Sequence, residues 1–397
     1  MVKRMDLKTI MMCSSMKRYI RHIYVVLVGT LLVVGCQKDG GTPQVMNDGS
    51  MIYLSAVTEG HVATRVPYEY TMPNDSNDGV LHAAIWASSF YTDQEGYTFP
   101  NPNPPLNGKN GTGENADQVA IHATANFDSG APQLLDQAVY PQSGTPVFFV
   151  GLHPQTGWQS DAEYKSASFT FDGSDDVMFA PRIEGKYADT STSDNIVFDV
   201  PELKFWHMLT WLKVRMIAED EQAMSAWGKI TDIKVTSNNH VSIDINRTDD
   251  YIENGKIDMT CATFSNSDGF DGLLSLYRPG SNDIFPQAGG YELKYFSSKV
   301  TAAEEVAYVL CSPVNALAKE VVDSEEVESP EYVLHIETER RRVEVPIDLR
   351  VNSTSFYEGS TRAKCFTLNL NFKMGNTIVV TANVADWTLG GSGHVEL

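Results

Sequence analysis

Short segments in which apolar and polar residues alternate recur along most of this 397-residue chain. The alternation has the period of two that places every second side chain of a strand on one face of a sheet. Clusters of Gly, Asn, Asp and Pro, such as NDSNDG at 74–79, separate the segments and mark turns. Because convincing helical periodicity is almost absent, the pattern predicts an all-β protein made of mostly antiparallel sheets, with no helix longer than a few turns.

The length of the chain predicts two domains of ordinary size, each able to bury its own core. We expect β-sandwiches at 51–220 and 221–397, joined near 218–226, where a short polar run covers 218–224. The stretch Lys204–Ile217 favours one long strand over the alternative of a helix, because Trp211, Val214 and Met216 alternate well in its second half. The predicted strands are 51–57, 80–87, 118–126, 146–152, 166–171, 175–180, 197–200, 204–217, 229–235, 240–245, 256–263, 291–295, 306–311, 332–337, 342–347, 364–372 and 377–387.

The N-terminal region predicts export and lipidation. A basic segment beginning at Lys17 precedes an apolar run at 23–34 that is too short for a spanning helix, so residues 1–35 read as a signal peptide, with Met16 as an alternative start. Val33-Val34-Gly35-Cys36 resembles a bacterial lipobox, which predicts cleavage between Gly35 and Cys36 and diacylation of Cys36. An ordinary signal with a cysteine nearby is the alternative. Two acyl chains anchor a protein stably to a membrane surface, and the Gly-, Pro- and Asp-rich segment 36–50 reads as a flexible lipidated tether.

Charge excludes some partners. The formal net charge is −21, and because residues 1–35 carry six Lys/Arg and one Asp, the remaining chain carries about −26. Such a charge repels phosphate groups, so we expect no nucleic acid partner. The cysteines after Cys36 are far apart and odd in number, which predicts neither a disulfide framework nor a zinc site. They are Cys261, Cys311 and Cys365.

The sequence shows no catalytic, cofactor or metal motif. It lacks the zinc-protease, P-loop, nucleophile-elbow and dinucleotide-binding patterns. The segment 75–79 looks like the start of a calcium loop, but Trp86 stands where a bidentate Glu is required. We expect His207 to be a core or edge histidine, with a ligand as the alternative. The six scattered Trp residues should pack in the core, with a sugar-binding platform as the alternative. The sequence therefore predicts a protein that is not an enzyme and needs no cofactor.

A set of motifs in fixed order resembles the fimbrillins, the FimA/Mfa-like subunits of type V pili of Bacteroidales bacteria. The resemblance covers nearly the whole chain. The motifs are the lipobox, Thr64-Arg65 after the first strand, the Y-P…G-x-P-V-x-F-x-G-x-x-P block at 140–154, D-D-V-M-F-A at 175–180, F-x-H-x-L at 205–209, F-Y-x-G at 356–359, F-T-L-N-L-N-F at 366–372 and I-V-V-T-A-N-V-A-D-W at 378–387.

The resemblance implies two tandem transthyretin-like β-sandwiches and a structural role at the cell surface. Cys36 would hold the precursor in the outer membrane, and a surface protease would cut after Arg65, so that the mature chain starts at Val66. The removed segment is Met51–Arg65, and its strand Met51–Val57 is expected to be accessible at a sheet edge of the first domain. Its groove would accept the C-terminal segment Thr377–Leu397 of another subunit, in a homo- or heteropolymer.

Other interpretations stay open. Anchor and some tip members of the resembled family keep their lipid, in which case Arg65 is an ordinary surface residue. A non-polymerising lipoprotein would retain residues 36–65 and bind glycans, host or bacterial surfaces through the loop 93–117 or exposed Trp residues. A secreted hydrolase would require a concave cluster of acidic or His residues.

Overall fold

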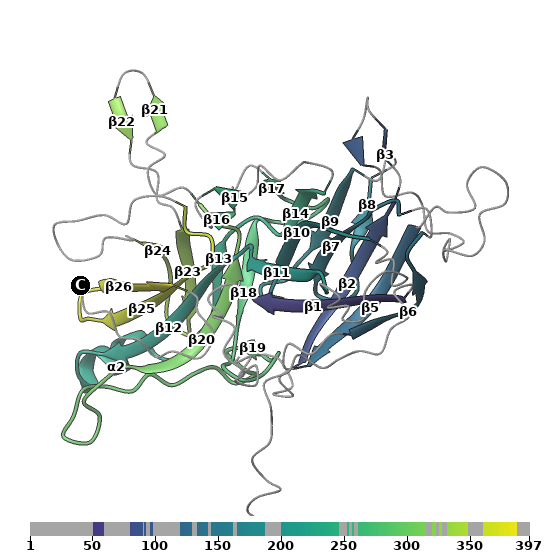
Figure 1. The fold of residues 1–397 in the computed structure, drawn as a ribbon. Coiled ribbons are helices and arrows are strands. Elements are labelled where there is room, and N and C mark those ends of the chain that lie inside the picture. Colours follow the sequence, from purple (N-terminus) through teal and green to yellow (C-terminus); the bar gives the residue numbers. More distant parts are fainter. Residues whose placement is uncertain are drawn as a thin grey trace, which may run out of the picture. The chain divides into compact units, whose positions relative to one another are not determined.

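The computed structural model describes residues 51–58, 80–89, 91–92, 96–97, 120–128, 133–141, 144–161, 165–186, 200–245, 252–253, 256–257, 261–314, 320–322, 325–327, 332–347 and 360–386. These residues form an all-β protein with two β-domains, as the alternation predicted (Figure 1). One short helix, α2 (Glu221–Trp227), lies among the described residues. No helix in the described ranges is long and apolar enough to cross a membrane.

The first domain is built on a seven-stranded sheet. The strands, in order of pairing, are β5 (Ala120–Asp128), β2 (Val80–Ser88), β7 (Val147–His153), β10 (Met178–Gly185), β11 (Glu202–His207), β1 (Met51–Thr58) and β6 (Gln133–Val139). The first and last strands of this path, β5 and β6, also contact each other, so the sheet nearly closes on itself. Its interior is filled by fully buried side chains such as Phe127, Phe149 and Phe205.

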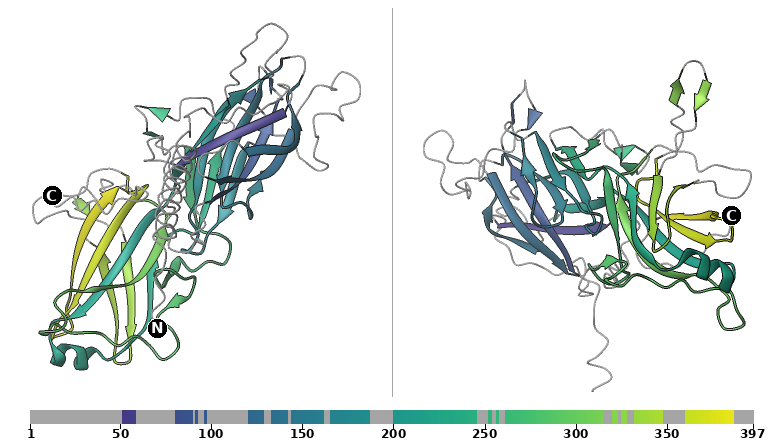
Figure 2. Two further views of the ribbon diagram at one scale, coloured as in Figure 1. Left: turned by 60° about the horizontal axis from the view of Figure 1, so that its bottom comes forward. Right: turned by 180° about the vertical axis from the view of Figure 1, so that it is seen from behind.

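The second domain is built on a nine-stranded sheet. The strands, in order of pairing, are β24 (Arg342–Ile347), β23 (Tyr332–Thr338), β13 (Ile230–Thr236), β18 (Leu273–Tyr277), β20 (Glu304–Cys311), β12 (Thr210–Ala218), β25 (Lys364–Phe372) and β26 (Ile378–Asp386), with β19 (Ile284–Phe285) pairing to β18. Here too the ends of the path, β24 and β26, are in contact. Figure 2 shows β25 and β26 beside β12, to which β25 is parallel.

A smaller four-stranded sheet combines strands from both halves of the sequence. Its order is β17 (Ala262–Ser265), β14 (His240–Asp244), β9 (Ser166–Thr170) and β8 (Gln159–Ser160). The remaining strands form separate pairs, which are β3 (Tyr91–Thr92) with β4 (Gly96–Tyr97), β15 (Ile252–Glu253) with β16 (Lys256–Ile257), and β21 (Glu320–Val322) with β22 (Glu325–Val327).

Strand β25 shows how the sequence produces a strand. Phe366, Leu368, Leu370 and Phe372 are fully buried, while the Thr and Asn residues between them stay partly accessible. A half-buried strand requires this alternation, and the predicted range 364–372 is the observed one. Its partner β12 packs Leu212, Val214 and Met216 into the same core.

Some local predictions differ from the structure. The stretch 204–217 is two strands, β11 and β12, because the chain leaves the first sheet at Met208 and enters the second at Thr210. The polar run 218–224 holds the start of α2, where the Asp220 carboxylate caps the helix by accepting a hydrogen bond from the Ala223 amide at 2.7 Å. Residues 291–295 make only isolated bridges. The domain limits 51–220 and 221–397 stay a prediction, because the sheet to which a strand belongs does not show whether each domain folds independently.

Candidate assembly site

Strand β1 is an internal strand of the first sheet. It runs parallel to β11, with Ser55 opposite Glu202 and Thr58 opposite Phe205, and antiparallel to β6 on its other side. The expectation that this strand would be accessible at a sheet edge is therefore wrong. Alternation along a strand shows which face is buried, but it does not show which strands lie on either side.

The side chains of β1 form part of the core of the first domain. Ile52, Leu54 and Ala56 have no exposed surface. The neighbouring strands contribute Leu203 and Phe205 from β11 and Leu135 from β6, each at most 1% exposed. Removal of β1 would leave β6 and the β1-facing edge of β11 without hydrogen-bonding partners, with an apolar slot between the two strands.

The residues predicted to be processed lie outside the described residues. These are Gly35, Cys36, Arg65 and Val66. The described part of β1 ends at Thr58, seven residues before Arg65. The F-Y-x-G motif, most of the 93–117 loop and the chain after Asp386 also fall outside the described ranges.

Three of the motifs that resemble fimbrillins meet in space. The 140–154 block forms β7, D-D-V-M-F-A leads into β10, and F-x-H-x-L covers the end of β11, and these three strands are neighbours in one sheet. Met178 of β10 stands opposite both His153 and His207. The motifs thus lie on three consecutive strands of the first sheet, and the last of them, β11, pairs with β1.

His207 is a core residue, as predicted. Its Nδ1 lies 2.8 Å from Asp176 Oδ2, and both side chains are fully buried. The Arg362 guanidinium donates a hydrogen bond to the His207 carbonyl oxygen at 2.9 Å. Sequence reasoning did not find this pair or Arg362, because alternation gives no information about contacts between residues 155 positions apart.

The loop before β10 is crowded with carboxylates. Burial, with the charges of Asp172 and Asp176, raises the pKa of Asp175 from 3.8 to about 6. The Asp172 carboxylate accepts hydrogen bonds from the amide and hydroxyl of Ser174 at 2.8 and 2.7 Å. In the part of the chain that the structure describes, no three His, Cys, Asp or Glu residues are grouped so that they could hold a metal ion.

The tryptophans and cysteines in the described ranges mostly serve packing. Trp86, Trp206 and Trp227 are at most 5% exposed, so the prediction of core packing is confirmed for these three. Trp86 stacks on His122 with ring centroids 4.3 Å apart, and burial lowers the pKa of His122 to about 4. Cys261 and Cys311 are buried free thiols, and burial raises the pKa of the partly buried Cys365 to about 11.

No sequence model of a protein family matches this chain, and no curated protein matches it. Solved structures do match. One is a candidate cell adhesion protein from Bacteroides uniformis ATCC 8492, with 12% identity and a TM-score of 0.44 over 86% of this chain and 99% of that chain. Another is a fimbrial protein from Bacteroides vulgatus ATCC 8482, with 13% identity and a TM-score of 0.37 over 85% of this chain and 100% of that chain. A third, a candidate adhesin from Bacteroides thetaiotaomicron VPI-5482, has 9% identity and a TM-score of 0.39 over 87% and 99%. Such low identities and TM-scores do not identify a function.

Proposed function

We propose that this protein is a structural subunit of a bacterial surface fimbria, exported as a lipoprotein and assembled by strand exchange after cleavage at Arg65. The observation that carries the proposal is the position of β1, an internal strand that lies within the first 60 residues of the chain and ahead of a candidate cleavage site. A strand in that position can be removed by one cut without breaking any later part of the chain.

The energetics favour replacement of a lost β1. The slot would expose the apolar surface of β11 and β6, at about 25 cal/mol per Å². It would also leave the amide and carbonyl groups that now pair with β1 without partners. An incoming strand from another subunit would cover the apolar surface and restore the backbone hydrogen bonds. The intact precursor stays monomeric because its own strand fills the slot.

The proposed donor is the C-terminal segment Thr377–Leu397 of a neighbouring subunit. In the isolated chain β26 pairs with β25 over nine residues, so the donor strand is paired within its own subunit before exchange. Strand β26 is the last strand on the sheet path, and its release leaves every other ladder of that sheet intact. A head-to-tail contact of this kind does not close on itself and generates a filament.

The same proposal includes the type of the two β-domains and the cellular location of the precursor. The two β-domains would be transthyretin-like sandwiches, and the lipid on Cys36 would hold the precursor in the outer membrane until cleavage. The partners would be copies of this chain or other pilus subunits. Retention of the N-terminal segment would instead favour an anchor, a tip adhesin or a lone surface-binding lipoprotein.

Replacement of Arg65 by Ala tests the assembly step. The Arg65→Ala chain should fold normally and remain monomeric, while the wild-type chain cut at Arg65 forms polymers that size-exclusion chromatography resolves. N-terminal sequencing of protein taken from the native surface should give Val66. If cleaved wild-type protein and Arg65→Ala protein are both monomeric at high concentration, strand exchange is not the mechanism.

Replacement of Cys36 by Ala tests the lipid anchor. The variant should accumulate as an unprocessed or misplaced precursor, because the acyl chains supply the membrane affinity. Membrane fractionation and mass spectrometry of the N-terminal peptide measure this. Normal maturation and display of Cys36→Ala would contradict lipidation without bearing on the cut at Arg65.

A further inference from the structure

Three consecutive arginines, Arg340–Arg342, follow the end of β23 and lead into β24. In an unfolded chain this sequence offers successive cleavage positions to any endopeptidase whose specificity pocket accepts arginine. Exposed loop tips are the usual places where proteases cut folded proteins. The β23–β24 turn is such a tip, so its conformation decides whether the arginines can be reached.

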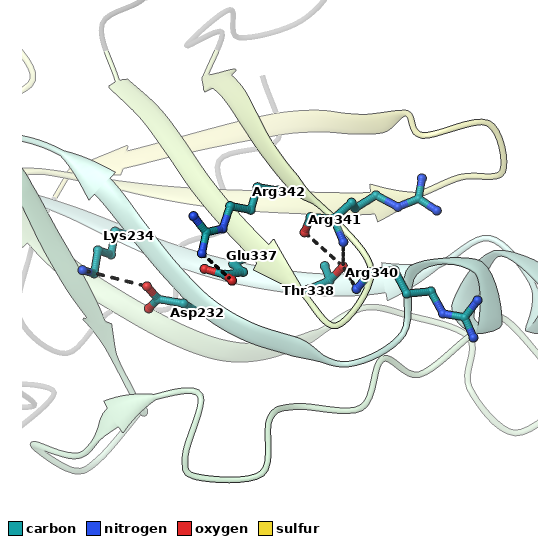
Figure 3. A network of polar contacts seen from close by, with 7 residues as sticks. All are labelled: Asp232, Lys234, Glu337, Thr338, Arg340, Arg341 and Arg342. Atoms are coloured by element: carbon teal, nitrogen blue, oxygen red, sulfur yellow. Dashed lines mark hydrogen bonds and ion pairs between the residues drawn. The ribbon is translucent and has the colours of Figure 1, made fainter.

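The backbone of the turn is held by Thr338. The Thr338 hydroxyl oxygen accepts hydrogen bonds from the amides of Arg340 and Arg341, at 3.2 and 3.1 Å, and the hydroxyl donates to the Arg341 carbonyl at 3.2 Å (Figure 3). The Thr338 amide also donates to that carbonyl at 2.8 Å. Thr338 is only 5% exposed, so water competes poorly for these bonds.

The Arg341 side chain is held as firmly as its backbone. Its guanidinium donates to the Ala226 carbonyl at 2.8 Å, and its central carbon lies 4.4 Å from the centre of the buried Trp227 ring. This contact also occupies a carbonyl group in the last turn of α2. A protease that cuts after Arg341 has to withdraw this side chain from both partners.

Residues on both sides of Arg341 also hold the turn by hydrogen bonds. Glu339 exchanges two hydrogen bonds with Lys229, one through its amide at 2.9 Å and one through its carboxylate at 3.1 Å. Arg342 donates to the Glu337 carboxylate at 2.9 Å, across the first pair of the hairpin. Figure 3 shows Arg342 turned toward Glu337, while Arg340 and Arg341 extend from the opposite side of the turn.

We propose that Arg340–Arg342 is a conditional proteolytic site, closed in the folded chain by the Thr338 hydrogen bonds and open once the hairpin comes apart. An endopeptidase binds its substrate as an extended strand, which this turn cannot become while both amides and the Arg341 carbonyl are bonded to Thr338. When the turn opens, hydrolysis after Arg340 or Arg341 adds one water across the peptide bond and leaves a new carboxylate and a new amine. The site lets an arginine-specific endopeptidase cut unfolded copies in this hairpin and leaves the hairpin of folded copies intact.

The identity of the endopeptidase rests on the proposed maturation at Arg65, but the closed turn does not. Trypsin, which also cuts after arginine, serves as the probe. The two cuts are distinguishable by mass, because cleavage at Arg65 removes an N-terminal segment and cleavage in the turn releases a C-terminal fragment that begins at Arg341, Arg342 or Val343.

The experiment is limited trypsin digestion of the full chain in detergent, followed by mass spectrometry of the fragments. Thr338→Val keeps the shape of the side chain and removes the hydroxyl, whereas Thr338→Ser keeps the hydroxyl. When the turn recloses faster than trypsin cuts, the cleavage rate follows the equilibrium population of the open turn. We therefore expect cleavage in the turn to be about tenfold faster or more in Thr338→Val, which lacks the hydroxyl. In Thr338→Ser the cleavage rate should stay near the wild-type rate.

Thr210→Val is the matched control for general loss of stability. Thr210 is also buried, and its hydroxyl lies 2.9 and 2.8 Å from the carbonyl and hydroxyl oxygens of Thr361, far from the turn in sequence. The control should accelerate cleavage in the turn much less than Thr338→Val does. Rapid cleavage of the wild-type turn under native conditions overturns the proposal, and so do equal rates for Thr338→Val and Thr338→Ser or for Thr338→Val and Thr210→Val.

Discussion

At the scale of single residues, Asp175 makes stability depend on pH. Its pKa is raised from 3.8 to about 6, chiefly by burial, so the folded chain binds this proton more tightly than the unfolded chain does. The free energy of unfolding therefore falls as pH rises from about 4 to about 6. Asp175→Asn should remove this loss and raise the free energy of unfolding at pH 7 by about 1 kcal/mol once solvent screening is allowed for.

Urea unfolding at pH 4 and at pH 7 measures the effect of Asp175→Asn. Little difference from wild type is expected at pH 4, where Asp175 is already protonated in the folded state. Asp268→Asn, at an exposed carboxylate, is the control and should change stability little at either pH. An equal gain at both pH values would mean that the charge of the buried Asp175 carboxylate is not the cause.

At the scale of elements, β1 should stabilise the precursor against unfolding but should not contribute to the stability of the polymer. Leu54 is fully buried, so Leu54→Ala should lower the free energy of unfolding of the precursor by about 2–5 kcal/mol. The polymer no longer contains this strand if the proposed cut occurs, so its denaturant resistance should match wild type. Leu368→Ala, equally buried in β25, should weaken both forms. A polymer weakened by Leu54→Ala would show that β1 is retained.

The elements also show how far sequence reasoning reaches. Strands with strong alternation, such as β24 and β25, are predicted with their observed limits. Strand β6 and helix α2 were missed, because QLLDQAV alternates weakly and a seven-residue helix is too short for its period to emerge. The neighbours of β1 could not be predicted, since pairing depends on residues far apart in sequence.

At the scale of the whole molecule, charge should control the rate of assembly. Residues 36–397 carry about −26, of which residues 36–65 contribute −1, so cleaved subunits with about −25 repel one another at neutral pH. The screening length falls from about 30 Å at 0.01 M salt to about 3 Å at 1 M. We expect polymer formation after cleavage, followed by light scattering, to accelerate as NaCl is raised. Uncleaved Arg65→Ala protein should not scatter more in the same salt, and a rate that falls with salt would indicate attraction between opposite charges instead.

The four-stranded sheet has a consequence for how a subunit would carry tension. Strand β9 precedes the crossing between the two large sheets and β14 follows it, and the two strands pair over five positions from Ser166 opposite Asp244 to Thr170 opposite His240. The two halves of the chain are thus joined by the covalent chain at Met208 and Leu209, by this ladder and by further hydrogen bonds, such as the one from the Leu310 amide to the Gly173 carbonyl at 2.8 Å. Pulling the two halves of a subunit apart would load these hydrogen bonds as well as the covalent chain. If the proposed filament forms, tension within each subunit would therefore be shared between the backbone and the ladder.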